Sequence, residues 1–173
     1  MNLLSLLHRG RLALPVAFFL ATADFTTKEL AVRWLPPAHV PHEVLGKVLR
    51  FTLGYNRQAV MSLPAGPYAR PLLIAISLVV MLVVLRLLWG APPKATLQRL
   101  ALGLVLGGAI GNLLSRVLSP RGVVDFIDVG LGARRLYTFN VADIGICCGA
   151  ALLALALWHD RPRAPSGAPA PTG

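Results

Sequence analysis

The chain has 173 residues, of which 55% are hydrophobic and only 14% are charged. A soluble domain carries roughly 25% charged residues, so this composition excludes an ordinary soluble globule and a disordered chain. Lys and Arg outnumber Asp and Glu by 17 to 7, which gives a formal net charge of +10. The basic residues are spread along the chain and form no stripe, so we expect them to contact anionic lipid headgroups and not nucleic acid. The sequence therefore predicts a small integral membrane protein.

Four apolar stretches are long enough to cross about 30 Å of hydrocarbon as helices, which takes roughly 20 residues each. We predict membrane spans over about residues 12–32, 72–90, 100–118 and 141–158. The predicted fold class is a membrane all-α bundle of four transmembrane helices. All four belong to a single domain over residues 1–160. A Pro-, Ala- and Gly-rich tail follows, and we expect it to be disordered and cytoplasmic over residues 161–173.

The first predicted span has a second interpretation. The apolar run Leu12–Leu20 follows basic residues and precedes Ala21-Thr22-Ala23, which is typical of a cleavable signal peptide. Asp24 and Lys28 favour a retained helix instead, because residues four apart share one helix face and can pair there. A cleaved peptide explains neither charge.

Glycines recur every four residues in the last two predicted spans, at Gly103, Gly107 and Gly111 and again at Gly145 and Gly149. Small residues at this interval predict that helix backbones approach closely in lipid. Chance gives the same pattern in a chain with 16 glycines, so this interpretation competes with a trivial one.

Two long loops carry strand patterns. In the first, Phe51, Leu53 and Tyr55 alternate with small or polar residues, which is typical of a strand. In the second, residues 123–127 and 136–139 have the composition of short strands. We therefore predict a small extracytoplasmic β-sheet formed by these loops at one membrane face.

Polar residues of the predicted spans gather at the membrane face opposite the termini, since four spans return the chain to its starting side. The gathered residues are Asp24 and Lys28 of the first span, Asn112, Ser115 and Arg116 of the third, Asp125 of the following loop, and Asn140 and Asp143 of the fourth. An acid in a span costs about 2.5–3.5 kcal/mol at the bilayer centre, so such residues are normally buried against partners and functional. Taken alone, Asp143 is equally well explained as a helix cap that favours the helix dipole.

Basic residues near the termini side lie in short segments, whereas those of the opposite side are spread over longer ones. The positive-inside rule is strongest for short segments. We therefore expect both termini in the cytoplasm and the polar cluster near the extracytoplasmic face.

The sequence contains no HExxH, no Gly-x-Ser-x-Gly, no Walker loop and no Cys/His metal spacing, so we expect no metal and no cofactor. Two carboxylates held close together cannot both ionise cheaply, so one keeps a proton while the other acts as a base. Such a pair activates a water and polarises a carbonyl, which is peptide hydrolysis without a metal. Asp125 and Asp143 are candidates for this pair, although the residue pattern does not choose Asp125 over Asp128.

Five motifs occur in order along the chain. They are Asp24-Phe-Thr-Thr-Lys28, Asn56-Arg-Gln-Ala-Val-Met-Ser62, Gly107-Gly-Ala-Ile-Gly-Asn-Leu-Leu-Ser-Arg116, Val123-Val-Asp-Phe-Ile-Asp128 and Phe139-Asn-Val-Ala-Asp143. With them the chain resembles bacterial lipoprotein signal peptidase (signal peptidase II) from end to end, the tail excepted. The resemblance implies an intramembrane aspartyl endopeptidase of the bacterial cytoplasmic (inner) membrane. Such an enzyme removes the signal peptide from diacylglyceryl-modified prolipoproteins by cleaving just before the lipidated cysteine.

The resemblance also implies roles for individual residues. It assigns Asp125 and Asp143 as the catalytic dyad. Supporting residues implied in the same way are Asn112, Arg116 and Asn140 around the dyad, Asn56 on the substrate backbone, and Asp24 with Lys28 as a brace for the first helix. The implied partners are lipid-modified prolipoproteins and membrane lipids, and we expect a monomer.

Two departures from the family pattern stand out. The family usually has Asp at the position of Ser115, so a salt bridge to Arg116 or a neighbour is expected to be missing. The family's Asn-x-Gly-Ala-Ala-Phe run has Gln58 in place of Gly and Met61 in place of Phe. These two changes affect the loop conformation and the shape of the substrate pocket, and neither touches the implied dyad.

Two other classes of function compete with a peptidase. A proton-coupled transporter would use Asp24, Lys28 and Asp143 as a relay, which predicts acids distributed through the depth of the membrane, whereas these acids cluster at one face. A non-catalytic membrane scaffold gives no reason for Asp125 and Asp143 to lie in matching motifs.

Overall fold

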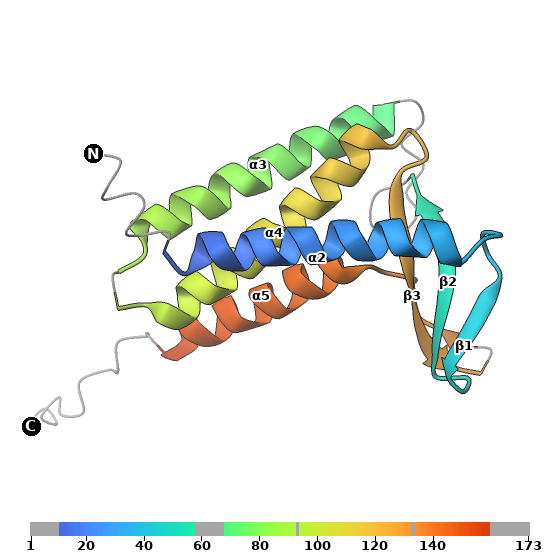
Figure 1. Cartoon of the computed structure of the whole chain (residues 1–173). Coiled ribbons are helices and arrows are strands. Elements are labelled where there is room, and N and C mark those ends of the chain that lie inside the picture. The colour runs from blue at the N-terminus through green and yellow to red at the C-terminus, as the bar shows by residue number, and fades with distance from the viewer. Residues whose placement is uncertain (1–10, 58–67, 93, 133, 160–173) are drawn as a thin grey trace, which may run out of the picture.

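Four long helices lie side by side, and a four-stranded sheet covers one end of the bundle (Figure 1). The structure is a computed structural model that describes residues 11–57, 68–92, 94–132 and 134–159. The helices are α2 (Ala13–Trp34), α3 (Ala69–Gly90), α4 (Thr96–Leu118) and α5 (Val141–His159). The predicted tail and the substituted positions Gln58 and Met61 lie outside the described residues.

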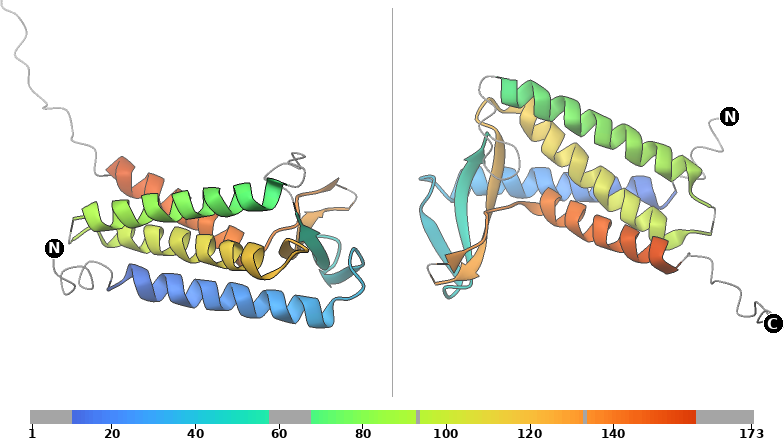
Figure 2. Two further views of the ribbon diagram at one scale, coloured as in Figure 1. Left: turned by 90° about the horizontal axis from the view of Figure 1, so that it is seen from above. Right: turned by 180° about the vertical axis from the view of Figure 1, so that it is seen from behind.

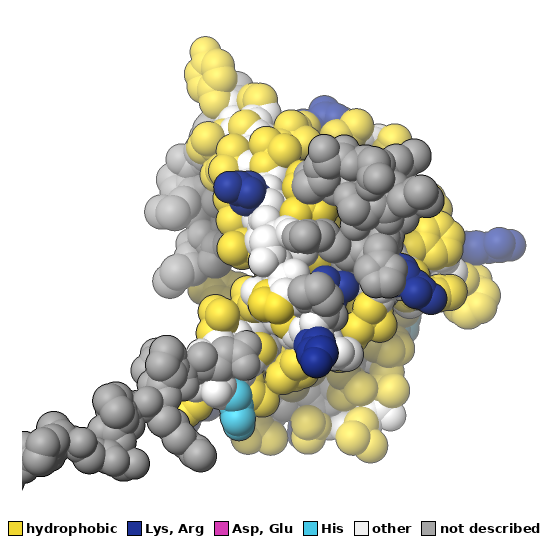
Figure 3. All heavy atoms as spheres, turned by 90° about the vertical axis from the view of Figure 1, so that its left-hand side faces the viewer, with side chains coloured by type: hydrophobic (Ala, Val, Ile, Leu, Met, Phe, Trp, Pro, Cys, Tyr) yellow, Lys and Arg dark blue, Asp and Glu magenta, His cyan; other side chains and the backbone are white. Residues whose placement is uncertain are grey.

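The start of α2 and the end of α5 lie at the end of the bundle opposite the sheet, as all three ribbon views agree (Figures 1 and 2). Seen from that end, the described residues present Lys, Arg and His side chains between hydrophobic ones, and no Asp or Glu side chain is visible among them (Figure 3). The two ends of the bundle therefore differ in chemistry, because the acidic side chains of the predicted cluster belong to the sheet end.

Three of these helices, α3, α4 and α5, are long and apolar enough to cross a membrane. They correspond to the second, third and fourth predicted spans, although α3 and α4 begin a few residues earlier, at Ala69 and Thr96. The first predicted span is a continuous helix, but α2 does not meet the same criterion, so four spans are not confirmed. Its charged residues Asp24, Lys28 and Glu29 lower its apolar character.

Helix α4 is the central helix and packs against α2, α3 and α5. Its contact with α2 depends on glycine, because a Cβ atom on Gly103 or Gly107 would lie 2.7 Å from the backbone oxygen of Ala13 or Ala17, respectively. No such distance is tolerated between real Cβ atoms and backbone, so only glycine permits this approach. The close packing predicted from the glycine spacing is confirmed for this pair of helices.

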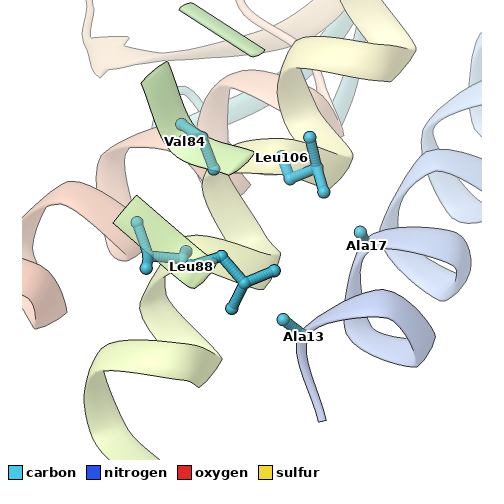
Figure 4. Packing of buried hydrophobic residues seen from close by; sticks show 6 residues of the cluster. Ala13, Ala17, Val84, Leu88 and Leu106 are labelled. Carbon is cyan, nitrogen blue, oxygen red and sulfur yellow. The ribbon is translucent and has the colours of Figure 1, made fainter. Parts of the chain in front are cut away.

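Small residues of α2 face branched residues of α3 and α4 in the apolar core of the bundle (Figure 4). Ala13 and Ala17 leave room there for Val84, Leu88 and Leu106, and Leu88 is only 1% exposed. Truncating a leucine buried to this extent costs about 2–5 kcal/mol. The core therefore fixes α2 against α3 and α4 at the end of the bundle away from the sheet.

The sheet is antiparallel throughout, in the order β1 (Pro41–Leu45), β2 (Leu49–Asn56), β3 (Val123–Leu131) and β4 (Arg134–Arg135). Strands β2 and β3 confirm the predicted strand patterns. The strand predicted over residues 136–139 is wrong, because only Phe139 of this segment forms a bridge, with Ile127. The apolar residues Leu136 and Tyr137 that suggested it are exposed and form no buried face.

Strand β3 connects the sheet to the bundle. Val124 and Phe126 pack with Ala31 of α2 and Leu53 of β2 in a second apolar cluster. Successive side chains of a strand point to opposite faces, so Asp125 between them points away from this cluster. The alternation places an acid of β3 beside the start of α5.

Candidate active site

The polar residues expected at one membrane face come together at the sheet end of the bundle. Asp24 and Asn140 are fully buried, and Lys28, Asn112 and Asp125 are each less than one-tenth exposed. Asp143 is half-buried. Residues from three helices and one strand therefore form a single polar cluster in an otherwise apolar bundle.

Lys28 joins α2 to α4. Its Nζ donates hydrogen bonds to Asp24 Oδ2 at 2.6 Å, to Asn112 Oδ1 at 3.0 Å and to Ser115 Oγ at 3.1 Å. An ammonium group has three N–H donors, and these bonds use all of them. The predicted pairing of Asp24 with Lys28 is confirmed, and the hydroxyl of Ser115 takes part in the same site. Because every donor has an acceptor, the buried charge is compensated.

The start of α5 is capped twice. Asn140 Oδ1 accepts the backbone N–H of Asp143 at 3.0 Å, and Asp143 Oδ2 accepts the backbone N–H of Asn140 at 3.2 Å, which is a reciprocal capping box. The carboxylate of Asp24, from α2, accepts the backbone N–H of Ala142 at 2.8 Å. The interpretation of Asp143 as a helix cap is therefore confirmed. The contribution of Asp24 to this cap was not expected from the sequence.

Asparagine side chains hold both candidate carboxylates. Asn140 Nδ2 donates to Asp125 Oδ1 at 2.6 Å, and Asn56 Nδ2 donates to Asp125 Oδ2 at 3.1 Å. Asn112 Nδ2 donates to Asp143 Oδ1 at 2.8 Å. Asn140 thus contacts the carboxylate of Asp125 through its side chain and the carboxylate of Asp143 through its backbone N–H. This one residue brings the strand acid and the helix acid to the same site.

The electrostatics of the site act most strongly on Asp125. Burial raises the pKa of Asp125 to about 6, and the negative charge of Asp143 adds to the rise. Hydrogen bonds from Asn140 and Asn56 and the charge of Lys28 lower this pKa without offsetting the burial. At this pKa the Asp125 carboxyl holds a proton under mildly acidic conditions in which an ordinary aspartate is ionised.

Asp128 has a different environment, although it lies only three residues from Asp125 on the same strand. Its carboxylate forms an ion pair with Arg135 Nε at 2.8 Å and accepts a hydrogen bond from Thr52 Oγ1 at 3.3 Å. Arg135 also donates to the backbone oxygens of Asp128 and Lys47. The geometry therefore separates the two acids that sequence patterns left equivalent, because Asp128 is held by an ion pair within the sheet.

Two arginines lie beside the cluster. Arg116 Nη1 donates to the backbone oxygen of Asn112 at 3.1 Å, while its buried Nε has no hydrogen-bond partner among the described residues. Arg70, at the start of α3, donates to the backbone oxygens of Arg116 and Val117 at 2.7 and 2.9 Å. Sequence reasoning missed Arg70, since an arginine in the first turn of a helix gives no signal. Its bonds hold the start of α3 to the end of α4.

No group of three His, Cys, Asp or Glu side chains that would hold a metal ion is found in residues 11–57, 68–92, 94–132 and 134–159. The donors that do converge are carboxylates with amide and ammonium neighbours. These are suited to proton transfer, because an acid with a raised pKa lies beside a second carboxylate.

Comparisons with known proteins identify the family of the chain. The family model described as signal peptidase (SPase) II matches residues 16–159. The lipoprotein signal peptidase of Hydrogenovibrio crunogenus is 40% identical over 130 residues, which cover 74% of this chain and 72% of the relative. That of Syntrophotalea carbinolica is 38% identical over 158 residues, which cover 89% and 95%. A solved bacterial membrane enzyme superposes with a TM-score of 0.76 at 26% identity, covering 86% of this chain and 88% of that one. The chain therefore belongs to the signal peptidase II family.

Proposed function

We propose that the chain is an intramembrane aspartyl endopeptidase that removes the signal peptide from diacylglyceryl-modified prolipoproteins, cleaving just before the lipidated cysteine. Membership of the signal peptidase II family supports a peptidase that acts on prolipoproteins. The aspartyl mechanism rests chiefly on one observation. Asn140 hydrogen-bonds Asp125 at 2.6 Å and Asp143 at 3.2 Å, so two carboxylates are held at one site.

In the proposed resting state the pair holds one proton, and Asp125 carries it. Burial and the nearby charge of Asp143 favour the protonated form of Asp125. Asp143 accepts two N–H donors and lies in the first turn of α5, where the positive end of the helix dipole favours an anion. Asp125 is therefore the proposed acid and Asp143 the proposed base.

Proton transfers then follow in two stages. In the first, Asp143 takes a proton from a water, the resulting hydroxide attacks the scissile carbonyl carbon, and the proton of Asp125 moves to the carbonyl oxygen. In the second, Asp143 gives its proton to the departing amide nitrogen. The C–N bond breaks, and a hydroxyl of the tetrahedral intermediate returns a proton to Asp125. The pair ends in its starting protonation state, so no external acid or base is consumed.

The supporting residues act by orienting the pair. Asn112 and Asn140 fix Asp143 and Asp125, respectively, and Asn56 contacts Asp125 at the exposed end of β2, where it can also reach a substrate backbone. Lys28 orients Asn112 by donating to its side-chain oxygen. We propose that Arg116 stabilises the negative charge of the site, because its guanidinium interacts electrostatically with Asp125 and Asp143.

We propose that α2 also crosses the membrane, as the first of four spans in a single domain over residues 1–160. Its buried charges, Asp24 and Lys28, are neutralised as a pair and do not face lipid. The basic side chains at the end of the bundle opposite the sheet (Figure 3) lie in short segments, which favours a cytoplasmic location for that end under the positive-inside rule. The sheet and the carboxylate pair then lie near the extracytoplasmic face of the bacterial inner membrane, in a monomeric enzyme with a cytoplasmic tail.

The test is cleavage of a synthetic lipidated precursor peptide by the purified chain. Asp125→Asn and Asp143→Asn should each abolish cleavage, because a neutral amide serves neither as base nor as acid. Asp128→Asn is the matched control and should retain substantial activity, since that acid is held within the sheet by Arg135. An inactive Asp128→Asn variant beside an active Asp125→Asn variant would contradict the assignment. Activity that EDTA abolishes and zinc restores would contradict the aspartyl mechanism.

A further inference from the structure

Four arginines gather at the corner of the molecule where β2 ends, α3 begins and α4 leads into β3. They are Arg57, Arg70, Arg116 and Arg121. The ion pairs of the described residues are Asp24–Lys28, Glu43–Arg50 and Asp128–Arg135, so none of these four arginines is paired with an acid in that part of the chain. Arg116 interacts electrostatically with Asp143 and Asp125, so the four arginines outnumber the acids that act on them and the corner carries a net positive charge.

A cavity of about 140 Å³ opens at this corner. Its polar lining includes Arg57, Arg70, Arg116, Asn56 and Ser119. A water occupies about 30 Å³ in the liquid, so the cavity holds a group several times larger than one water. We call this cavity, with its three arginines, the arginine pocket.

The guanidinium groups of the arginine pocket have more N–H donors than their hydrogen bonds with described residues use. Each guanidinium carries five N–H donors, whereas Arg70 uses two of its nitrogens on the end of α4 and Arg57 uses its Nε on the backbone oxygen of Arg121 at 3.4 Å. Nε of Arg116 is buried and has no acceptor in the described parts of the chain. The exposed guanidinium groups of Arg57 and Arg70 therefore have N–H donors available for an acceptor-rich ligand.

The depth of the arginine pocket in the bilayer identifies the ligand. The pocket lies where α3 begins and α4 ends, and both helices are apolar enough to cross a membrane. The hydrocarbon ends at that level and the lipid headgroups begin. Guanidinium groups match phosphate with paired N–H···O bonds, and phosphate is the anion that a bilayer supplies at this depth. We propose that the arginine pocket binds the phosphate group of an anionic phospholipid.

Binding of this kind would fix the position of the site relative to the membrane surface. Asn56 and Arg116 line the arginine pocket and also contact the polar cluster, since Asn56 donates to Asp125 and Arg116 donates to the backbone oxygen of Asn112. The proposal does not depend on the peptidase activity, because its test measures lipid binding and not cleavage.

The experiment is native mass spectrometry of the full chain in phosphatidylcholine-containing micelles, titrated with phosphatidylglycerol at an ionic strength of about 0.15 M, where exposed charges are screened beyond about 8 Å. The variant pair is Arg57→Gln with Arg70→Gln. A basic residue at a membrane surface contributes about 1 kcal/mol, or about fivefold, to the binding of anionic lipid. The double variant should therefore bind phosphatidylglycerol about 25-fold more weakly.

The matched control is Arg33→Gln with Arg134→Gln, which removes the same charge from two exposed arginines outside the arginine pocket. Screening should limit its loss to a few-fold. Equal losses in the two double variants would show a diffuse attraction and overturn the proposal. If loss of Arg70 unfolds the chain, the test uses Arg57→Gln alone, because Arg57 is exposed and its replacement should leave the fold intact. An unchanged affinity for phosphatidylglycerol in that variant also overturns the proposal.

A second arm separates lipid from free phosphate. Phosphatidylglycerol that stays bound in excess inorganic phosphate supports a lipid ligand. Inorganic phosphate that displaces the lipid, and that binds the lipid-free chain but not the Arg57→Gln variant, would identify a soluble ligand and overturn the lipid assignment.

Discussion

Replacing Asp125 with Asn should make the fold more stable at neutral pH while it removes activity. The pKa of Asp125 rises from 3.8 to about 6 on folding, so the folded state holds a proton that the unfolded state has released. Ionising this acid therefore weakens the fold. The penalty is absent below about pH 4, grows between about pH 4 and 6, and is complete above that range. About two pKa units correspond to about 3 kcal/mol.

The amide cannot ionise, so Asp125→Asn escapes this penalty. It has one acceptor oxygen in place of two, so it loses one of the bonds from Asn140 and Asn56, at about 1 kcal/mol. The expected net gain is about 2 kcal/mol at about pH 7.5, which for a chain of this size raises the unfolding midpoint by about 4–8 °C. At about pH 4 the penalty is nearly absent, so only the lost hydrogen bond remains and the variant should be about 1 kcal/mol less stable than the parent chain.

Thermal unfolding in detergent micelles at these two pH values measures the effect. Asp128→Asn is the control of opposite sign, because it removes the charge from the ion pair with Arg135 and should lower the midpoint at about pH 7.5. Hydrogen bonds to charged groups contribute about 1.5–3 kcal/mol, so the two variants should be well separated. A midpoint of Asp125→Asn that falls at about pH 7.5, or that shifts equally at both pH values, would refute the reasoning.

Three further predictions concern the rate, the packing and the topology. The kcat/KM should decline above about pH 6, where Asp125 of the free enzyme loses its proton. The kcat should decline only at higher pH, because bound substrate excludes water and thereby favours the protonated form of Asp125. The declining limbs report constants of the pair, and a pH-independent kcat/KM between about pH 5 and 8 would contradict the shared proton. Gly107→Ala should lower the unfolding midpoint by the equivalent of about 1–3 kcal/mol, because its Cβ would lie 2.7 Å from the backbone oxygen of Ala17, whereas Gly90→Ala, with open space around its Cβ, should not lower it. In a background without native cysteines, Ser119→Cys should react with an impermeant maleimide added to intact cells and Lys94→Cys should not; the reverse pattern would invert the proposed orientation.

The helices were predictable because a run of about 20 apolar residues has few alternative structures. Strands β2 and β3 were predictable from alternation, but β1 was not, because all five of its residues are exposed and no apolar pattern marks them. The segment 136–139 shows the opposite error, since its apolar residues mark no buried face. Periodicity therefore located elements whose faces are buried and failed where they are not.

The candidate site was predictable as a set of residues and not as a network. The cost of charge in a membrane singled out Asp24, Lys28 and Asp143, because such residues require partners. Asp125 and Asp128 could not be distinguished, since the difference between them comes from Arg135, which lies on another strand. The distinction depends on a contact between two strands, which the residues next to either acid in the sequence do not reveal.

The bond from the Asp24 carboxylate to the backbone of Ala142 has a consequence for biosynthesis. It joins the first described helix to the last, so the site is completed only when α5 has been synthesised and has docked against α2. A ribosome-bound chain that ends before α5 contains Asp125 but lacks Asp143, and its Asp24 has no helix start to bind. Under the proposed aspartyl mechanism, a nascent or truncated chain without α5 should therefore be inactive, and cleavage should begin only after α5 has docked against α2.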